Sequence, residues 1–167
     1  KHSSASHRSY ETANATSSVS YGQACSSTIN GICMTADLEM VFDLEFQAAY
    51  PDTMEAQAYS IVNIVEGYYI NDFKIAFTGF TVEFLDSDVF GTTVWANALV
   101  KNMQSQKAEN KLDFVKNEAA LLHLVTGKNL YGSTIGIAYK GSICDTSGYN
   151  VGLSQLLTND IPETALT

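Results

Sequence analysis

The histidines are the side chains that could bind a metal or carry a proton near neutral pH. His2 and His7 lie in a polar opening segment, separated by four residues, and this spacing in a flexible segment presets no metal geometry, so we expect a solvated tail. His123 has no second His or Cys near it in sequence, which favours a hydrogen-bonded structural residue over a ligand. A serine nucleophile elbow, a P-loop and a dinucleotide fingerprint are all absent from the sequence, so the enzyme classes that use them have no support.

The chain contains three cysteines, so at least one of them has no partner within it. Cys25 and Cys33 are close in sequence, and we predict a disulfide between them. Asn30-Gly31 between them is typical of a β-hairpin turn, although the bridge requires a wider loop than a strict two-residue turn. The low content of Lys and Arg and the many Ser, Thr, Tyr and Gly residues indicate an extracellular protein.

The 167 residues suit a single domain. With 46% hydrophobic residues and only 2 prolines the chain is too apolar to be disordered, and no apolar run reaches the roughly 18 residues of a membrane span. The 9 Lys and Arg residues against 18 Asp and Glu give a formal charge of −9. A phosphate backbone would be repelled on average, which argues against nucleic acid as a partner.

Hydrophobic periodicity indicates an alternation of strands and helices. Apolar residues alternate with polar ones from Leu38 to Phe46, which predicts a half-buried strand. Pro51 to Glu55 is typical of a helix start, and apolar residues follow at helical spacing up to an expected stop at Gly67. The alternation returns between Phe73 and Leu85. Strand, helix and strand in this order predict a parallel crossover.

The second half of the chain is predicted less uniformly. A helix is expected from Thr92 to Gln106 with Trp95 in the core, and helical character is expected again from Lys111 to Leu122. Segments from Thr134 to Ile143 and from Asn150 to Leu156 follow glycine-containing turns and are interpreted as strands.

The two ends of the sequence differ from the rest. Residues 1–34 are interpreted as a polar arm, in which Asn14 is a glycan acceptor only in a glycosylating host, and residues 35–167 as the folded domain. Asp160 to Glu163 is typical of the beginning of a helix, yet the sequence stops at Thr167. One turn of helix does not repay its nucleation cost, so we expect the chain to be a piece of a longer protein.

One stretch resembles a known family. Leu124 to Tyr139 reads L-V-T-G-K-N-L-Y-G-S-T-I-G-I-A-Y, and it is followed by Cys144 and by Val151 to Gln155. This pattern resembles the reprolysin, or adamalysin, branch of the metzincin zinc peptidases, and the resemblance extends more loosely from about Leu38 to the end. It implies an α/β (α+β) fold, in which helices flank a mixed, mostly parallel sheet with an antiparallel edge strand. The chain would be the N-terminal subdomain of a catalytic domain.

The resemblance also implies where the chemistry lies. In the family the zinc ligands and the general-base Glu stand in an H-E-x-x-H-x-x-G-x-x-H helix, and this sequence stops where that motif would begin. The chain would therefore carry no catalytic residue and no zinc ligand, and zinc would be bound by residues outside it. The strand resembling Ser133 to Tyr139 binds an extended substrate by backbone pairing in the family. This implies substrate-binding residues at Thr134, Ile135, Gly136, Ile137, Ala138 and Tyr139. The alternative for Gly136 is a bulge or tight crossing at a sheet edge.

The resemblance also implies roles for Cys144 and Glu39. Cys144 resembles a cysteine that pairs downstream of the zinc helix, which places its partner outside the chain; the alternative is a free, buried thiol. Glu39 corresponds to a carboxylate that helps to bind structural calcium, but the second carboxylate expected near Ala119-Ala120 is missing. We therefore keep calcium as a weak candidate and favour an exposed strand glutamate.

Two functional hypotheses follow. In the first, the chain is part of a secreted zinc-dependent endopeptidase and forms the upper wall of its cleft. Its partners would be an extended polypeptide substrate and the remaining part of the same protein, and alone it would be inactive. In the second, the chain is a non-catalytic extracellular binding or assembly module that kept the sheet and lost the zinc helix, and its edge strand pairs with a partner chain.

Overall fold

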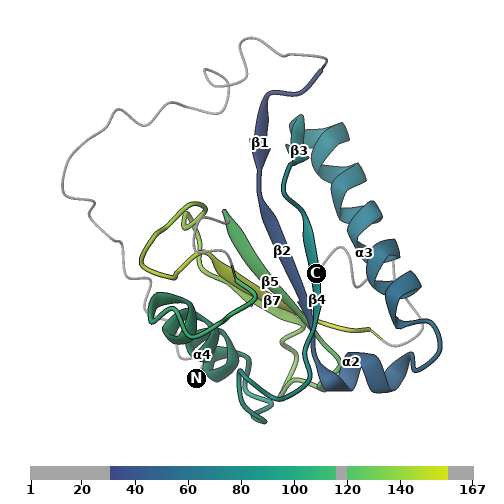
Figure 1. Ribbon diagram of the computed structural model, residues 1–167, viewed down its shortest axis with the longest axis vertical. Coiled ribbons are helices and arrows are strands. Elements are labelled where there is room, and N and C mark those ends of the chain that lie inside the picture. Colours follow the sequence, from purple (N-terminus) through teal and green to yellow (C-terminus); the bar gives the residue numbers. More distant parts are fainter. Residues whose placement is uncertain (1–30, 116–119, 158–167) are drawn as a thin grey trace.

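The computed structural model describes residues 31–115 and 120–157, which Figure 1 shows. In chain order the elements are β1 (Met34–Ala36), β2 (Leu38–Phe42), α2 (Leu44–Ala49), α3 (Met54–Tyr68), the π-helical turn η1 (Tyr69–Phe73), β3 (Ile75–Phe77), β4 (Thr81–Phe84), α4 (Ala96–Ala108), β5 (Leu121–Thr126), β6 (Gly136–Ala138) and β7 (Val151–Gln155). Most of the predicted arm, with Asn14 and Cys25, and the helix start at Asp160 lie outside the described residues. The division into arm and domain therefore stays a prediction.

Five strands form the main sheet in the order β4-β2-β5-β7-β6. The pairs β2–β4, β2–β5 and β5–β7 are parallel, and β6 runs antiparallel to β7 at one edge. β1 and β3 form a separate parallel pair. The predicted mixed, mostly parallel sheet with an antiparallel edge strand is confirmed, and so is the parallel crossover from β2 through α3 to β4.

Helices pack on the two faces of the sheet. α3 lies along β2 and β4, and α4 lies beside β7 (Figure 1). Successive residues of a strand point to opposite faces, so the central strands β2 and β5 supply apolar side chains to two separate cores. The core on the α3 side contains Leu38, Met40, Phe42, Phe46, Ala58, Ile61, Val62, Val125 and Leu156. The core on the α4 side includes Val41, Leu99, Val100, Met103, Leu122, Leu124, Val151 and Leu153.

The predicted half-buried strand from Leu38 to Phe46 is wrong in two respects. All five residues of β2 are buried, because β2 lies inside a parallel sheet covered on both faces. The strand also ends at Phe42, because the Asp43 carboxylate accepts a hydrogen bond from the Phe46 N–H and caps α2. The acidic residue Glu45 then belongs to the first turn of a helix, not to a solvent-facing strand position.

The helix and strands of the predicted crossover are present, but their boundaries differ from the prediction. The helical segment does not stop at Gly67: α3 ends at Tyr68 and continues directly into η1, which Lys74 terminates with a left-handed φ of 57°. The predicted strand from Phe73 to Leu85 is divided into β3 and β4. Gly79 lies in the turn between them with φ of 77°, and an added Cβ there would lie 2.8 Å from the Asp37 carboxylate.

In the second half of the chain, β7 confirms the predicted strand, but two predictions fail. Trp95 is 55% exposed, because it precedes the first turn of α4 instead of lying on its buried face. The expected helix from Lys111 to Leu122 is wrong where it is described, because Leu121 begins β5 between β2 and β7. A short apolar run in a central strand has no periodicity that distinguishes it from a buried helix.

Within the described residues, no helix combines the length and apolar character needed to cross a membrane.

Candidate functional site

The edge strand β6 pairs with β7 on one side, and no other strand among the described residues pairs with its second side. Ile135 accepts a hydrogen bond from the Gln155 N–H across 2.7 Å, and the register places Gly136 opposite Ser154 and Ile137 opposite Leu153. Hydrogen-bonded and non-hydrogen-bonded pairs alternate along an antiparallel ladder, so Ile135 and Ile137 direct their backbone groups towards β7. The N–H and C=O groups of Gly136 and Ala138 then face away from β7. We call these groups the outer edge of β6.

The six predicted substrate-binding residues thus differ in position. Gly136, Ile137 and Ala138 form the strand, whereas the exposed residues Thr134 and Ile135 precede it. Tyr139 follows it, packs against the α4-side core and makes an edge contact with Tyr149 at a ring-centroid distance of 5.0 Å. The outer edge of β6 offers donors and acceptors for an extended chain, while the half-buried side chains of Ile137 and Tyr139 pack against the core.

The start of the connection to β6 is held by Asp43. The side chain of Asp43 is buried, and its Oδ1 accepts from the Gly127 N–H across 2.9 Å and from the Phe46 N–H. Its Oδ2 accepts from the Thr126 hydroxyl. A Cβ added at Gly127 would lie 2.3 Å from the carbonyl carbon of Glu45, so only glycine fits there. The end of β5 is thereby packed directly on the first turn of α2.

Lys128 completes this junction with a buried ammonium. Its Nζ lies 2.7 Å from Glu45 Oε2, 2.7 Å from Asp88 Oδ1 and 3.6 Å from Asp43 Oδ2. Burial acts to lower the pKa of Lys128, but the bonds to Asp88 and Glu45 and the nearby carboxylate charges raise it above its ordinary value. Sequence reasoning did not single out Asp43 or Lys128. The available signal was an aspartate directly after an apolar strand, which is typical of a helix cap.

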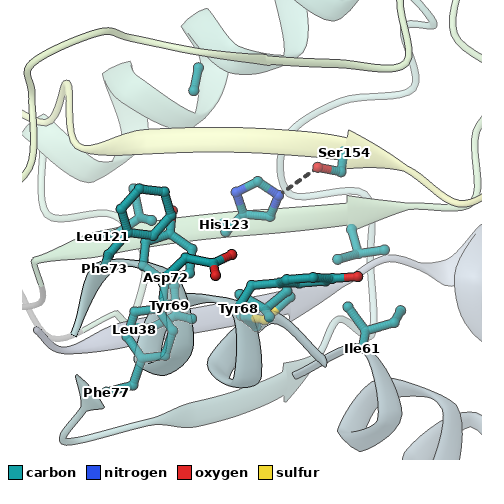
Figure 2. Close-up of a pocket in the computed structure, with 14 residues that line it drawn as sticks. Leu38, Ile61, Tyr68, Tyr69, Asp72, Phe73, Phe77, Leu121, His123 and Ser154 are labelled. Atoms are coloured by element: carbon teal, nitrogen blue, oxygen red, sulfur yellow. Dashed lines mark hydrogen bonds between the residues drawn. The ribbon is translucent and has the colours of Figure 1, made fainter. Parts of the chain in front are cut away.

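A cavity of about 460 Å³ lies on the α3 side of the sheet. Figure 2 shows His123 and Ser154 on one side of it, with Tyr68, Tyr69 and Asp72 from the end of α3 and from η1 on the other. The His123 Nε2 is 2.9 Å from the Ser154 hydroxyl, which confirms a hydrogen-bonded histidine. Burial lowers the pKa of His123 to about 4, so the ring is neutral at pH 7.

The described residues do not fit a zinc or calcium ion. They contain no group of three or more His, Cys, Asp and Glu residues that could hold one. Glu39 is only 3% exposed, so the expected exposed glutamate is wrong. It lies near the buried ammonium of Lys107; burial lowers the pKa of Lys107, and the charge of Glu39 opposes that shift. A lysine thus supplies positive charge near the predicted calcium carboxylate, and calcium at Glu39 stays a prediction that this arrangement does not support.

The cysteines are partly described. Cys33 is disulfide-bonded, but Cys25 lies outside the described residues and the predicted Cys25–Cys33 pairing stays a prediction. Cys144 is a free thiol and is exposed, so the alternative of a buried thiol is wrong. Its predicted bond to a cysteine outside the chain stays a prediction.

Comparisons with known proteins add the family. The profile of the family described as "Reprolysin (M12B) family zinc metalloprotease" matches residues 36–166. No curated protein matches the chain significantly. A solved structure described as "Structure of a chaperone-substrate complex" is 10% identical and has a TM-score of 0.56. The match covers 78% of this chain but 22% of that chain, and it supports the fold alone. Because the family profile spans most of the sequence, the chain belongs to the reprolysin family of zinc metalloproteases.

Proposed function

We propose that this chain is the substrate-pairing part of a secreted zinc metalloendopeptidase that cleaves extended polypeptides. The outer edge of β6 is the observation that carries the proposal. Gly136 and Ala138 present two N–H and two C=O groups that no other described strand pairs. An extended peptide lying antiparallel to β6 would add a sixth strand to the sheet and satisfy them.

The role of this chain is binding and orientation. Backbone pairing gives affinity for any extended peptide, and it fixes the peptide's direction and register relative to the sheet. The Asp43 and Lys128 junction holds the start of the β5–β6 connection, and pairing with β7 holds β6 itself. Hydrolysis requires groups that the described residues do not supply, and the 167 residues contain no H-E-x-x-H motif. Zinc ligands would come from other parts of the protein.

Secretion is part of the same proposal. It is supported by the disulfide at Cys33 and by the family, and the low Lys and Arg content agrees with it.

The test uses the protein as isolated from its source. We expect a mass larger than that of the 167 residues, or a tightly held second fragment, with about one zinc per molecule. We also expect cleavage of extended peptides that stops on chelation and returns with zinc. A zinc-free protein that binds extended peptides without cleaving them would instead support the non-catalytic binding module. A protein that neither binds nor cleaves them would overturn both.

A further inference from the structure

Two exposed aromatic rings lie near the start of β6. Trp95 is 55% exposed and Tyr131 is 62% exposed, and their ring centroids are 4.0 Å apart at an interplanar angle of 34°. Val94 beside them is 40% exposed. We call Val94, Trp95 and Tyr131 the aromatic patch. Singly exposed rings are common on protein surfaces, but adjacent exposed apolar side chains gain free energy together when a ligand covers them, which favours a binding role.

The backbone holds the aromatic patch in one arrangement. The Tyr131 N–H donates to the Val94 carbonyl across 2.9 Å, and the Trp95 N–H donates to the Thr93 hydroxyl across 3.2 Å. The first bond ties the segment before α4 to the segment before β6, and the second fixes the backbone locally at Trp95. Rings that are already stacked and anchored lose little conformational entropy when a ligand covers them, which is typical of residues that dominate binding energy.

The aromatic patch is close to the outer edge of β6. Gln155, the last residue of β7, accepts from the Leu130 N–H with its side chain across 2.9 Å. Its own N–H donates to the Ile135 carbonyl across 2.7 Å. Gln155 therefore bonds both ends of the segment 130–135, Leu130 through its side chain and Ile135 through its backbone. This places Tyr131 close to the beginning of β6.

The direction of a paired peptide then determines which part of it reaches the patch. A peptide antiparallel to β6 passes the beginning of β6 with its C-terminal residues. Tyr131 is five residues before Gly136, so at about 3.3 Å per residue the rings lie within about five peptide positions of the residue opposite Gly136. The rings offer an apolar surface, so an aliphatic or aromatic side chain gains most there.

We propose that the aromatic patch is a substrate subsite that selects an apolar side chain on the C-terminal side of the peptide bound to β6. This inference rests on the proposed function, because the peptide must pair with the outer edge of β6 to reach the patch. It adds side-chain selectivity to a strand whose backbone groups alone do not discriminate between sequences.

The experiment compares nested peptides on the full-length protein. Starting from the shortest peptide that is cleaved, one version is extended at its C-terminus by four residues that include Leu and Phe, and a matched version by four serines. We expect the apolar extension to raise kcat/KM about tenfold and the serine extension to leave it within about twofold.

Variants connect this gain to the rings. In Tyr131→Ser we expect the ratio of extended to short peptide kcat/KM to fall from about ten to about one, whereas Tyr59→Ser keeps the ratio. Tyr59 is a matched control, because it is 51% exposed but lies on α3. A second readout is the fluorescence of Trp95, which is the one tryptophan in the 167 residues. Its emission, assigned by its loss in Trp95→Phe, should shift when the apolar extension binds.

The outcomes separate the two proposals. If the short peptide is cleaved but the apolar extension brings no gain, or if the gain survives Tyr131→Ser, the subsite is wrong and the proposed function stands. If no extended peptide is bound or cleaved, both proposals are wrong.

Discussion

Residues 126–128 and residues 136–138 lie at the two ends of one connection, and they differ in most physical respects. The first three are held by the buried carboxylate of Asp43 and by an ion cluster in which the Lys128 side chain is 6% exposed. The last three form an edge strand that, within residues 31–115 and 120–157, pairs on one side only. The comparison separates two kinds of residue within one family motif, those that anchor the end of β5 and those whose backbone we propose to bind substrate.

The largest expected effect on the free energy of unfolding is at residues 126–128. Lys128→Met leaves the carboxylates of Asp43, Glu45 and Asp88 without their cation, and we expect the free energy of unfolding to fall by about 2–4 kcal/mol. This range allows for the partial exposure of Glu45 and Asp88, which solvent screens. Urea unfolding measures it. Lys101→Met on the exposed side of α4 is the control, with a change within about 0.5 kcal/mol. A loss below about 1 kcal/mol for Lys128→Met would show that the cluster does not hold the junction.

Proline substitutions at two adjacent residues of β6 test the direction of its backbone groups. Ile137→Pro removes an N–H that faces β7, and we expect it to cost about 2–3 kcal/mol of unfolding free energy. Ala138→Pro removes an outward N–H, which edge strands tolerate, so it should cost less than about 1 kcal/mol while weakening peptide binding. Thermal melting and peptide titration on the same preparations separate the two. Equal destabilisation by both variants would contradict the assigned direction of the backbone groups.

The close contact at Gly127 gives a smaller effect. Gly127→Ala places a Cβ against the backbone of Glu45 and Phe46, and we expect about 2 kcal/mol of destabilisation as α2 shifts. Gly67→Ala is the matched control, because nothing lies within 4 Å of its added Cβ and it stands inside α3. That variant should be more stable than the wild type by about 0.5–1 kcal/mol. Similar melting temperatures for the two variants would rule out tight packing at Gly127.

The smallest expected effect is a pH dependence of the free energy of unfolding that comes from His123 on β5. As pH falls below the ordinary pKa of His123, 6.5, the unfolded chain takes up a proton that the folded chain takes up only near pH 4. The free energy of unfolding should therefore fall between pH 6.5 and 4. We expect about 1–2 kcal/mol, because the ring also faces a cavity that water can enter. Urea unfolding at pH 7 and pH 4.5 measures this change in the wild type and in His123→Gln. An equal change in both would assign it to other groups.

The fold was predictable where local pattern and burial agree. The helix α3, the strand β7 and the antiparallel edge were expected from periodicity, turn signals and the family resemblance. The failures lie where tertiary burial overrides period. β2 is buried on both faces and four of the six residues of β5 are buried, so alternation is a poor guide to these strands. The end of β2 did have a local signal, because the Asp43 cap joins residues only three apart.

For the candidate site, the sequence predicted only the range of residues involved and not the role of each residue. The resemblance located residues 134–139, but the division into inward and outward backbone groups depends on the register with β7. The Lys128 cluster joins residues 40 and 83 positions apart, and the Trp95–Tyr131 pair joins two loops. No local spacing rule reports such contacts, because they exist only once the sheet has formed.

Amide hydrogen exchange at β6 tests the central claim most directly. In the free protein, the amides of Gly136 and Ala138 should exchange quickly and that of Ile137 slowly, because only Ile137 donates towards β7. A saturating extended peptide should protect Gly136 and Ala138 and leave Ile137 unchanged. If the amides of Gly136 and Ala138 are already protected without peptide, or exchange equally fast with it, β6 is not the strand that pairs with substrate.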